Sequence, residues 1–236
     1  MDYLEDLVAA YRILAEYGVI DAYGHVSIRS PANPQRYFIA RSLAPEIVQA
    51  EDIMEYDLDS KPLEARGRES VRERFIHGEV YKARSDVMAV VHNHSPSVIP
   101  FSVTGVPMRP IYHMASFIGD GVPNFEIRDY EKGTDLLVKT PKLGAALAKT
   151  LGKSPASLMR GHGAVVAGQS IRHAVFVSNY LELNAKLQMQ SMAMGRIKYL
   201  YRGEVDAVIA RTSHYTLNRA WENWARRAGR EMQEME

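Results

Sequence analysis

The feature that most constrains the fold is a short apolar run that ends in two histidines. Residues 86–94 read Asp-Val-Met-Ala-Val-Val-His-Asn-His, with valines at the centre of the run. A stretch of this length and composition is typical of a strand buried in a sheet that is covered on its faces. Because side chains two apart on a strand share a face, His92 and His94 are predicted to point the same way.

The rest of the chain alternates between helical and extended patterns. Helical spacing predicts helices near 2–18, 70–83, 140–152 and 170–195, and extended patterns predict strands near 23–30, 37–40, 53–56 and in two pieces within 157–168. Asp2 and Gly18 are the start and stop signals of the first helix. These patterns favour an α/β fold in one domain over 1–236, with a mixed central sheet and a polar tail from about 200.

Composition excludes several classes of protein. The chain has no cysteine, which rules out thiol catalysis, thiolate metal sites and disulfides. Its 29 basic and 28 acidic residues balance, so the chain lacks the strong overall positive charge that is typical of nucleic-acid-binding proteins. The sequence contains no run of about 20 apolar residues, which is the length needed to cross a membrane. The first residues lack the basic start of a signal peptide. We therefore expect a cytoplasmic protein without nucleic-acid or membrane partners.

The histidines suggest a metal site. His92 and His94 could share a dication such as Zn²⁺ or Mn²⁺, or they could satisfy hydrogen bonds at the sheet edge. A third candidate, His162, lies between Gly161 and Gly163, where the backbone can bend sharply and expose the ring. Three histidines would leave open positions on the ion, as in catalytic sites; the alternative is a turn histidine whose glycines serve only the turn.

Glu73 is the candidate carboxylate. On the helix expected near 70–83, Glu73 and His77 are four residues apart and share a face. The carboxylate could ligate the ion or carry a proton, although a solvated glutamate in a charge-rich helix is the competing interpretation. Of the other histidines, His25 follows Gly24 and could contact a substrate. His113 could line a cleft or pack in the core, and His173 and His214 are expected at the surface.

Taken together, these residues resemble the class II aldolase/adducin family from about residue 4 to about residue 200. The matching pieces are 24–27 (Gly-His-Val-Ser), Glu73 with His77, 89–94 (Ala-Val-Val-His-Asn-His) and 160–163 (Arg-Gly-His-Gly). The resemblance implies a three-layer α/β/α sandwich around a mixed, mainly antiparallel sheet. It also implies one divalent ion per subunit, Zn²⁺ or Mn²⁺, held by His92, His94 and His162, with Glu73 as acid/base. Family enzymes are usually tetramers with sites near subunit interfaces, so a homo-oligomer is expected.

Departures from the phosphosugar aldolases of that family point to another substrate. This chain has His25 where they usually have Asn, and Val71 and Arg72 where they usually have hydroxyl residues. Their phosphate loop is replaced by 41–45 (Arg-Ser-Leu-Ala-Pro). Guanidinium groups suit carboxylates, so a small-molecule carboxylate is the expected partner, and the predicted substrate-binding residues are Arg41, Arg72, His25 and Ser42.

The pattern is similar to the branch that decarboxylates hydroxylated aromatic or heteroaromatic dicarboxylates, such as 3-hydroxy-2-methylpyridine-4,5-dicarboxylate and 3,4-dihydroxyphthalate. The predicted activity is therefore a metal-dependent carbon–carbon lyase that removes CO₂ through a keto form of the ring, while the metal stabilises charge on the ring oxygen. The enzymatic alternative is an aldolase that cleaves a sugar phosphate or a hydroxy-keto acid. A second alternative is a non-catalytic interaction module, as in adducin.

Overall fold

The computed structural model describes residues 3–234, with side chains described through residue 229, so the expected start signal Asp2 lies outside the described residues. The helices are α1 (Tyr3–Glu16), α2 (Phe75–Ala83), α3 (Ile99–Val103), α4 (Pro141–Leu151), α5 (Ile171–Met194), α6 (Arg202–Ile209) and α7 (His214–Glu234). The strands are β1 (His25–Arg29), β2 (Arg36–Ala40), β3 (Ile53–Asp57), β4 (Ala89–Asn93), β5 (Asn124–Phe125), β6 (Ala156–Met159) and β7 (Gly163–Gly168). Short 3₁₀ turns occupy Pro45–Ile47, Ala50–Asp52, His113–Ile118 and Ile127–Asp129.

Within residues 3–234 the strands form one seven-stranded sheet in the order β3-β2-β1-β4-β7-β6-β5. Neighbouring strands run antiparallel except β5 and β6, which are parallel. The predicted mixed, mainly antiparallel sheet is therefore confirmed. Strand β4 lies at its centre, as its apolar sequence indicates, between β1 and β7.

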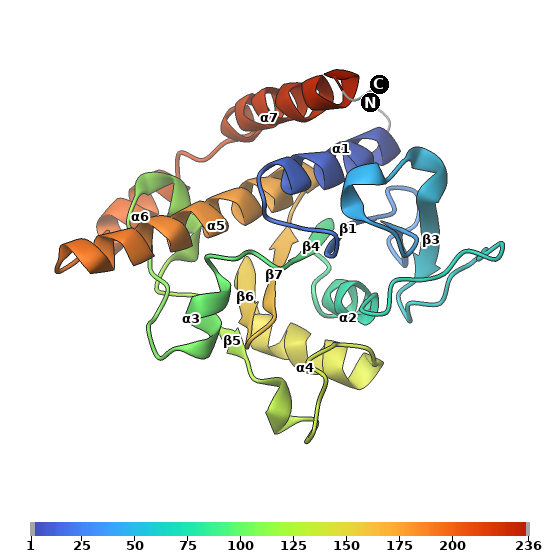
Figure 1. The fold of residues 1–236 in the computed structure, drawn as a ribbon, viewed down its shortest axis with the longest axis horizontal. Coiled ribbons are helices and arrows are strands. Elements are labelled where there is room, and N and C mark those ends of the chain that lie inside the picture. Colours follow the sequence, from blue (N-terminus) through green and yellow to red (C-terminus); the bar gives the residue numbers. More distant parts are fainter. Residues whose placement is uncertain (1–2, 235–236) are drawn as a thin grey trace.

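Helices cover both faces of this sheet, which gives the expected three layers (Figure 1). Alternate side chains of β4 and β7 enter two separate cores. Val91 and Val166 pack in the core under α1 and α5, whereas Val90 and Val165 pack in the core under α2 and α4. Because His92 is two residues beyond Val90, its ring lies on the α2 and α4 face.

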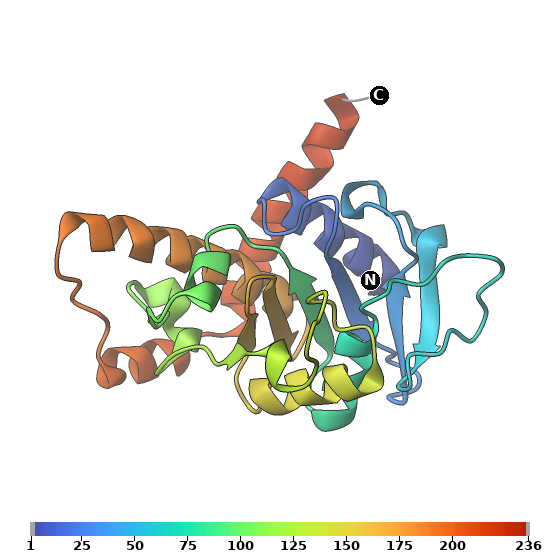
Figure 2. The same cartoon turned by 60° about the horizontal axis from the view of Figure 1, so that its bottom comes forward.

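The C-terminal helix α7 packs against the core that lies under α1 and α5. Trp221 and Trp224 of α7 are buried in the core that α1 and α5 also line. The ring centroid of Trp224 is 5.8 Å from that of Tyr17 and 5.7 Å from that of Tyr180. Both tryptophans therefore serve packing. The C-terminal end of α5, together with all of α6, extends away from the sheet (Figure 2). Among residues 3–234, no helix has the length and apolar content needed to span a bilayer.

One predicted boundary is wrong: the helix expected near 70–83 begins at Phe75. The preceding residues form tighter turns, because Arg74 N donates to Val71 O, Ile76 N to Glu73 O and His77 N to Arg74 O, each across three residues. Glu73 therefore lies in the turn that leads into α2. Both Glu73 and His77 nevertheless reach the sheet, as their predicted shared face requires.

The two glycines around His162 serve different needs. Gly161 has a φ of +65°, in the left-handed region where a side chain is strained. Gly163 instead allows close approach of β7 to β4, since a Cβ there would lie 1.9 Å from the Asn93 carbonyl oxygen.

We expect Gly163→Ala to force the two central strands apart at the histidines. The free energy of unfolding should fall by about 3 kcal/mol or more, because the added Cβ would clash with main-chain atoms of β4 that cannot move without displacing the strand. Chemical denaturation measures it, with Gly105→Ala as the control, where a Cβ meets nothing within 4 Å. Equal stability of the two variants would contradict the close approach.

Candidate metal centre

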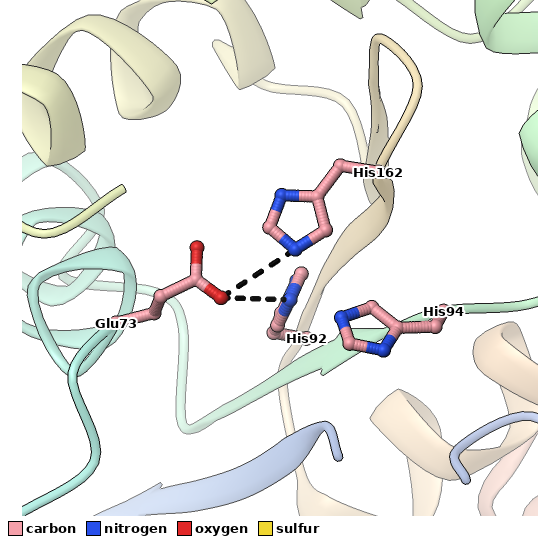
Figure 3. A group of neighbouring side chains, drawn as sticks. All are labelled: Glu73, His92, His94 and His162. Atoms are coloured by element: carbon pink, nitrogen blue, oxygen red, sulfur yellow. Dashed lines mark ion pairs between the residues drawn. The ribbon is translucent and has the colours of Figure 1, made fainter. Parts of the chain in front are cut away.

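Four side chains meet at the end of the central strands. His92 is the last residue but one of β4, and His94 directly follows that strand. His162 lies in the turn between β6 and β7, and Glu73 comes from the turn before α2. Figure 3 shows the carboxylate and the three rings converging. One ligand atom from each residue lies within 4.8 Å of the others. The structure therefore brings together the four residues that the sequence singled out.

Hydrogen bonds fix the tautomers of two of the rings. His92 Nδ1 lies 3.1 Å from the Ala164 carbonyl oxygen, and His162 Nδ1 lies 3.0 Å from the Leu136 carbonyl oxygen. A carbonyl only accepts, so each Nδ1 carries the hydrogen and donates it. With its hydrogen on Nδ1, each ring has Nε2 left to bind a metal ion, as metal-ligating histidines do when their other nitrogen is held by an oxygen.

The third ring is held by a carboxylate. His94 Nδ1 lies 3.3 Å from Asp21 Oδ1, which also accepts a hydrogen bond from Tyr23 N. The Nε2 atoms of His94 and His92 are both buried and have no hydrogen-bond partner among the described residues. Buried polar atoms are rarely left in this state, so these two lone pairs indicate a missing ligand.

Asp21 was not predicted from the sequence, and it gives a separate test. We expect Asp21→Asn to weaken divalent metal binding about 10- to 100-fold, because the amide holds the His94 ring less firmly and makes it a weaker donor. Competition with a chromophoric chelator measures the dissociation constant. Asp120→Asn, at an exposed carboxylate paired with Arg202, is the control. Unchanged affinity in Asp21→Asn would contradict the role of this carboxylate.

Glu73 is buried, with 7% of its surface exposed, so the competing interpretation of a solvated glutamate is wrong. Its Oε1 accepts a hydrogen bond of 2.8 Å from Val138 N. Its Oε2 lies 3.5 Å from His92 Nε2 and 3.5 Å from His162 Nε2. One carboxylate oxygen is thus anchored to the backbone while the other faces the imidazoles.

The charges of this cluster suit a cation. Burial raises the pKa of Glu73, but the His92 and His162 rings outweigh it and hold the pKa well below its usual range. Burial lowers the pKa of His162, but the Glu73 carboxylate overcomes this and leaves the pKa raised. Burial, with His92 and His162 nearby, lowers the pKa of His94 to about 4. At neutral pH the cluster therefore offers a carboxylate and a neutral His94 ring.

The donor set fits a divalent metal ion. Zn²⁺ lies about 2.0–2.1 Å from imidazole nitrogens, so tetrahedral donors stand about 3.4 Å apart. The 3.5 Å separations between Glu73 Oε2 and two Nε2 atoms are close to that value. Imidazole nitrogen and carboxylate oxygen also suit Mn²⁺. The orphaned nitrogens, the fixed tautomers and the negative charge thus agree.

A cavity of about 410 Å³ opens beside the cluster and is lined by His94, His162 and Glu73. Of the predicted substrate residues, His25, Ser42 and Arg72 line it as well.

Arg41 is placed differently. Its Nε donates to Asp52 Oδ1 at 2.6 Å, and it is not among the described residues that line the cavity. This placement does not support the substrate role predicted for Arg41, because Asp52 already neutralises its charge.

The other walls of the cavity are apolar. Leu43, Val71 and Leu137 line it, together with Tyr23, whose side chain is largely exposed at the mouth. The Tyr23 and His94 ring centroids are 6.4 Å apart. The cavity therefore combines the Arg72 guanidinium, the Glu73 carboxylate and apolar surface.

The remaining histidines lie outside the cluster. His113 and His214 are exposed, and His173 is half-buried near the start of α5. His77 is fully buried and contacts His25 and Ser27. Its contact with His25 was not predicted, although the shared parity of His25 and Ser27 on one strand is visible in the sequence.

Comparison with known proteins identifies the family of this chain. A family model described as the class II aldolase and adducin N-terminal domain matches residues 5–189, which include all four clustered residues. The chain belongs to this family. The predicted family resemblance is thereby confirmed.

Relatives within the family include decarboxylases. The decarboxylase tropJ of Talaromyces stipitatus is 34% identical over an alignment of 244 positions, which covers 93% of this chain and 91% of that protein. A 3,4-dihydroxyphthalate decarboxylase of Arthrobacter keyseri is 31% identical, covering 81% of this chain and 79% of that protein.

A solved structure confirms the fold. The L-fuculose 1-phosphate aldolase of Glaciozyma antarctica PI12 superposes with a TM-score of 0.80 at 22% identity, covering 98% of this chain and 90% of that one. Family and relatives together support an enzyme of the lyase class.

Proposed function

We propose that this protein is a divalent-metal-dependent decarboxylase of hydroxylated aromatic or heteroaromatic carboxylates. The observation that carries the proposal is the convergence of three imidazoles and Glu73 beside a cavity that Arg72 also lines. The decarboxylase names of two relatives support the same reaction class. The ion is Zn²⁺ or Mn²⁺, one per subunit, on His92, His94 and His162.

The cavity suits a planar anion better than a sugar phosphate. Leu43, Val71 and Leu137 offer apolar surface to a ring. Arg72 has no ion pair with a described residue, so its guanidinium is free to hold a carboxylate through two parallel hydrogen bonds. His25 and Ser42 line the same space and can bind further oxygens.

Loss of CO₂ from an aromatic ring needs a proton on the ring carbon and a place for the electrons. Glu73 is ionised, so it can take the proton of a ring hydroxyl on Oε2 and return it to the carbon that bears the carboxylate. The bond to CO₂ then breaks, its electrons restore the aromatic ring, and the ring oxygen left negative takes a proton from solvent. A positioned acid/base of this kind contributes about 10²- to 10⁴-fold.

When bound, the metal ion supplies Lewis-acid stabilisation of negative charge on the substrate oxygen, worth several kcal/mol. The histidines hold the ion, and Val138 N holds Glu73 Oε1 so that Oε2 faces the same point. Arg72 orients the ring by its second carboxylate, which places the reacting carbon near Glu73.

Arg72 and Arg41 form a matched pair for testing substrate binding. We expect Arg72→Met to raise KM for a dicarboxylate about 10- to 100-fold, because a charged hydrogen bond is lost. Arg41→Met should change KM little, since Arg41 pairs with Asp52 outside the cavity lining. Steady-state kinetics on both variants measure the difference. An equal effect of the two substitutions would contradict this assignment.

The function is tested by a screen for CO₂ release. Purified protein with Zn²⁺ or Mn²⁺ is offered ortho-hydroxy aromatic and heteroaromatic dicarboxylates, beginning with 3,4-dihydroxyphthalate. Metal-dependent CO₂ release supports the proposal. Cleavage of a sugar phosphate or hydroxy-keto acid to an aldehyde, without CO₂, would establish the aldolase alternative. Absence of bound metal and of turnover would favour a non-catalytic module.

A further inference from the structure

A buried row of hydrogen bonds runs between β1 and α2 and ends at the cavity. His25 and Ser27 are two apart on β1, and His77 and Tyr81 are four apart on α2, so each pair shares a face. Ser27 Oγ lies 2.8 Å from Tyr81 Oη and 2.6 Å from His77 Nδ1. His77 Nε2 lies 2.6 Å from His25 Nδ1. The row therefore links a phenol to a residue that lines the cavity.

All four side chains are shielded from water. Ser27 and His77 are 0% exposed, Tyr81 is 1% exposed and His25 is 6% exposed. Buried polar groups need partners, so one hydrogen must lie between each neighbouring pair. Ser27 Oγ carries one hydrogen and has two neighbours in the row, so if it accepts from Tyr81 its own hydrogen must go to His77, because no other acceptor lies beside it among the described residues.

Chemistry sets the direction of these hydrogen bonds. Burial raises the pKa of the Tyr81 phenol, so it keeps its hydrogen. That buried hydrogen needs an acceptor, and Ser27 Oγ, 2.8 Å away, is the one that the described residues place beside it. Ser27 then donates its own hydrogen to His77 Nδ1, which must be the bare nitrogen. Burial lowers the pKa of His77 to about 3, so the ring is neutral and carries its hydrogen on Nε2. That hydrogen is donated to His25 Nδ1.

His25 is the last residue of the row. With Nδ1 accepting from His77, a neutral His25 carries its hydrogen on Nε2. The His25 ring lines the cavity and stands opposite His92 across the two strands, with ring centroids 5.0 Å apart. The structure gives Nε2 no partner among the described residues, so its N–H is available to a ligand beside the metal centre.

We infer that Tyr81, Ser27 and His77 fix His25 as an Nε2–H donor to an anionic oxygen of the substrate. His25 is then a substrate-binding residue, and His77 is a positioning residue that acts through it. The oxygen's identity as part of a hydroxy-carboxylate rests on the proposed function. The orientation of the hydrogen bonds does not.

The two parts are tested by two measurements on full-length protein, with and without Zn²⁺. Nitrogen NMR of ¹⁵N-histidine protein reports which ring nitrogen of His25 is protonated, with His25→Gln used for assignment. Kinetics with the substrate found in the CO₂ screen report KM and kcat. Circular dichroism melting confirms that each variant is folded.

His77→Phe keeps a ring of similar size but cannot donate to His25. We expect His25 to lose its single Nε2–H form and KM to rise about tenfold or more, with a smaller change in kcat and unchanged metal content. His77→Gln, whose amide can still donate near the Nε2 position, should bring KM back to within about threefold of wild type. Tyr81→Phe should shift the His25 tautomer, whereas Tyr11→Phe, which removes a buried phenol bonded to Val26 O, should not.

An unchanged His25 tautomer and KM in folded His77→Phe would overturn the inference. So would a wild-type His25 protonated on Nδ1. If wild-type protein releases no CO₂ from any substrate, the proposed function fails, and the NMR result still decides the hydrogen-bond direction.

Discussion

Replacing His94 with alanine should leave the purified protein almost free of divalent metal. The structure gives the ion three buried or half-buried Nε2 donors, and removal of one leaves a two-histidine site beside Glu73. We expect metal content after dialysis to fall from about one ion per chain to below about a tenth, with loss of turnover. Elemental analysis of protein dialysed with excess Zn²⁺ or Mn²⁺ measures the content.

The control is His214→Ala, because His214 is an exposed histidine far from the cluster in sequence and outside it in the structure. That variant should retain full metal content. Full retention by His94→Ala would remove His94 from the ligand set and leave its unpartnered Nε2 without explanation.

Replacing Glu73 with glutamine should separate metal binding from catalysis. Glutamine has nearly the same size and can still accept the hydrogen bond from Val138 N through its amide oxygen. It cannot take a proton and return it to the ring carbon. We expect kcat to fall about 10²- to 10⁴-fold while the three histidines retain the ion.

Two observations would contradict that role. Turnover near the wild-type rate would dismiss Glu73 as the proton carrier, and loss of metal together with turnover would make it chiefly a ligand. Glu46→Gln, at an exposed glutamate of the Pro45–Ile47 turn, is the control and should change neither quantity.

Local patterns predicted the sheet and the positions of the clustered histidines on it. The period of two on a buried strand placed His92 on the face of Val90, and the glycines around His162 marked a turn between two strands. The family resemblance added the order of layers. These features depend on residues close in sequence, where strand geometry and turn chemistry act directly.

Long-range partners could not be predicted in the same way. Arg41 was expected to bind substrate, but Asp52 meets its guanidinium across an intervening turn. Glu73 was weighed as a surface residue, and its burial depends on Val138, 65 residues away. Asp21 reaches His94 over 73 residues. No periodicity reports such contacts, because they arise only when the sheet and its loops assemble.

The predicted tetramer and cytoplasmic location stay predictions. The site described above is built from residues of one chain. Neither the metal test nor the tests on Glu73 and Arg72 depends on the number of subunits.

The central claim is that three imidazoles hold one cation through their Nε2 atoms. Crystals grown with Zn²⁺ or Mn²⁺, measured with X-rays at the absorption edge of the metal, test it most directly. We predict one anomalous peak per chain, about 2.0–2.2 Å from Nε2 of His92, His94 and His162. A peak elsewhere, or none at these rings in protein shown to carry the metal, would contradict the account.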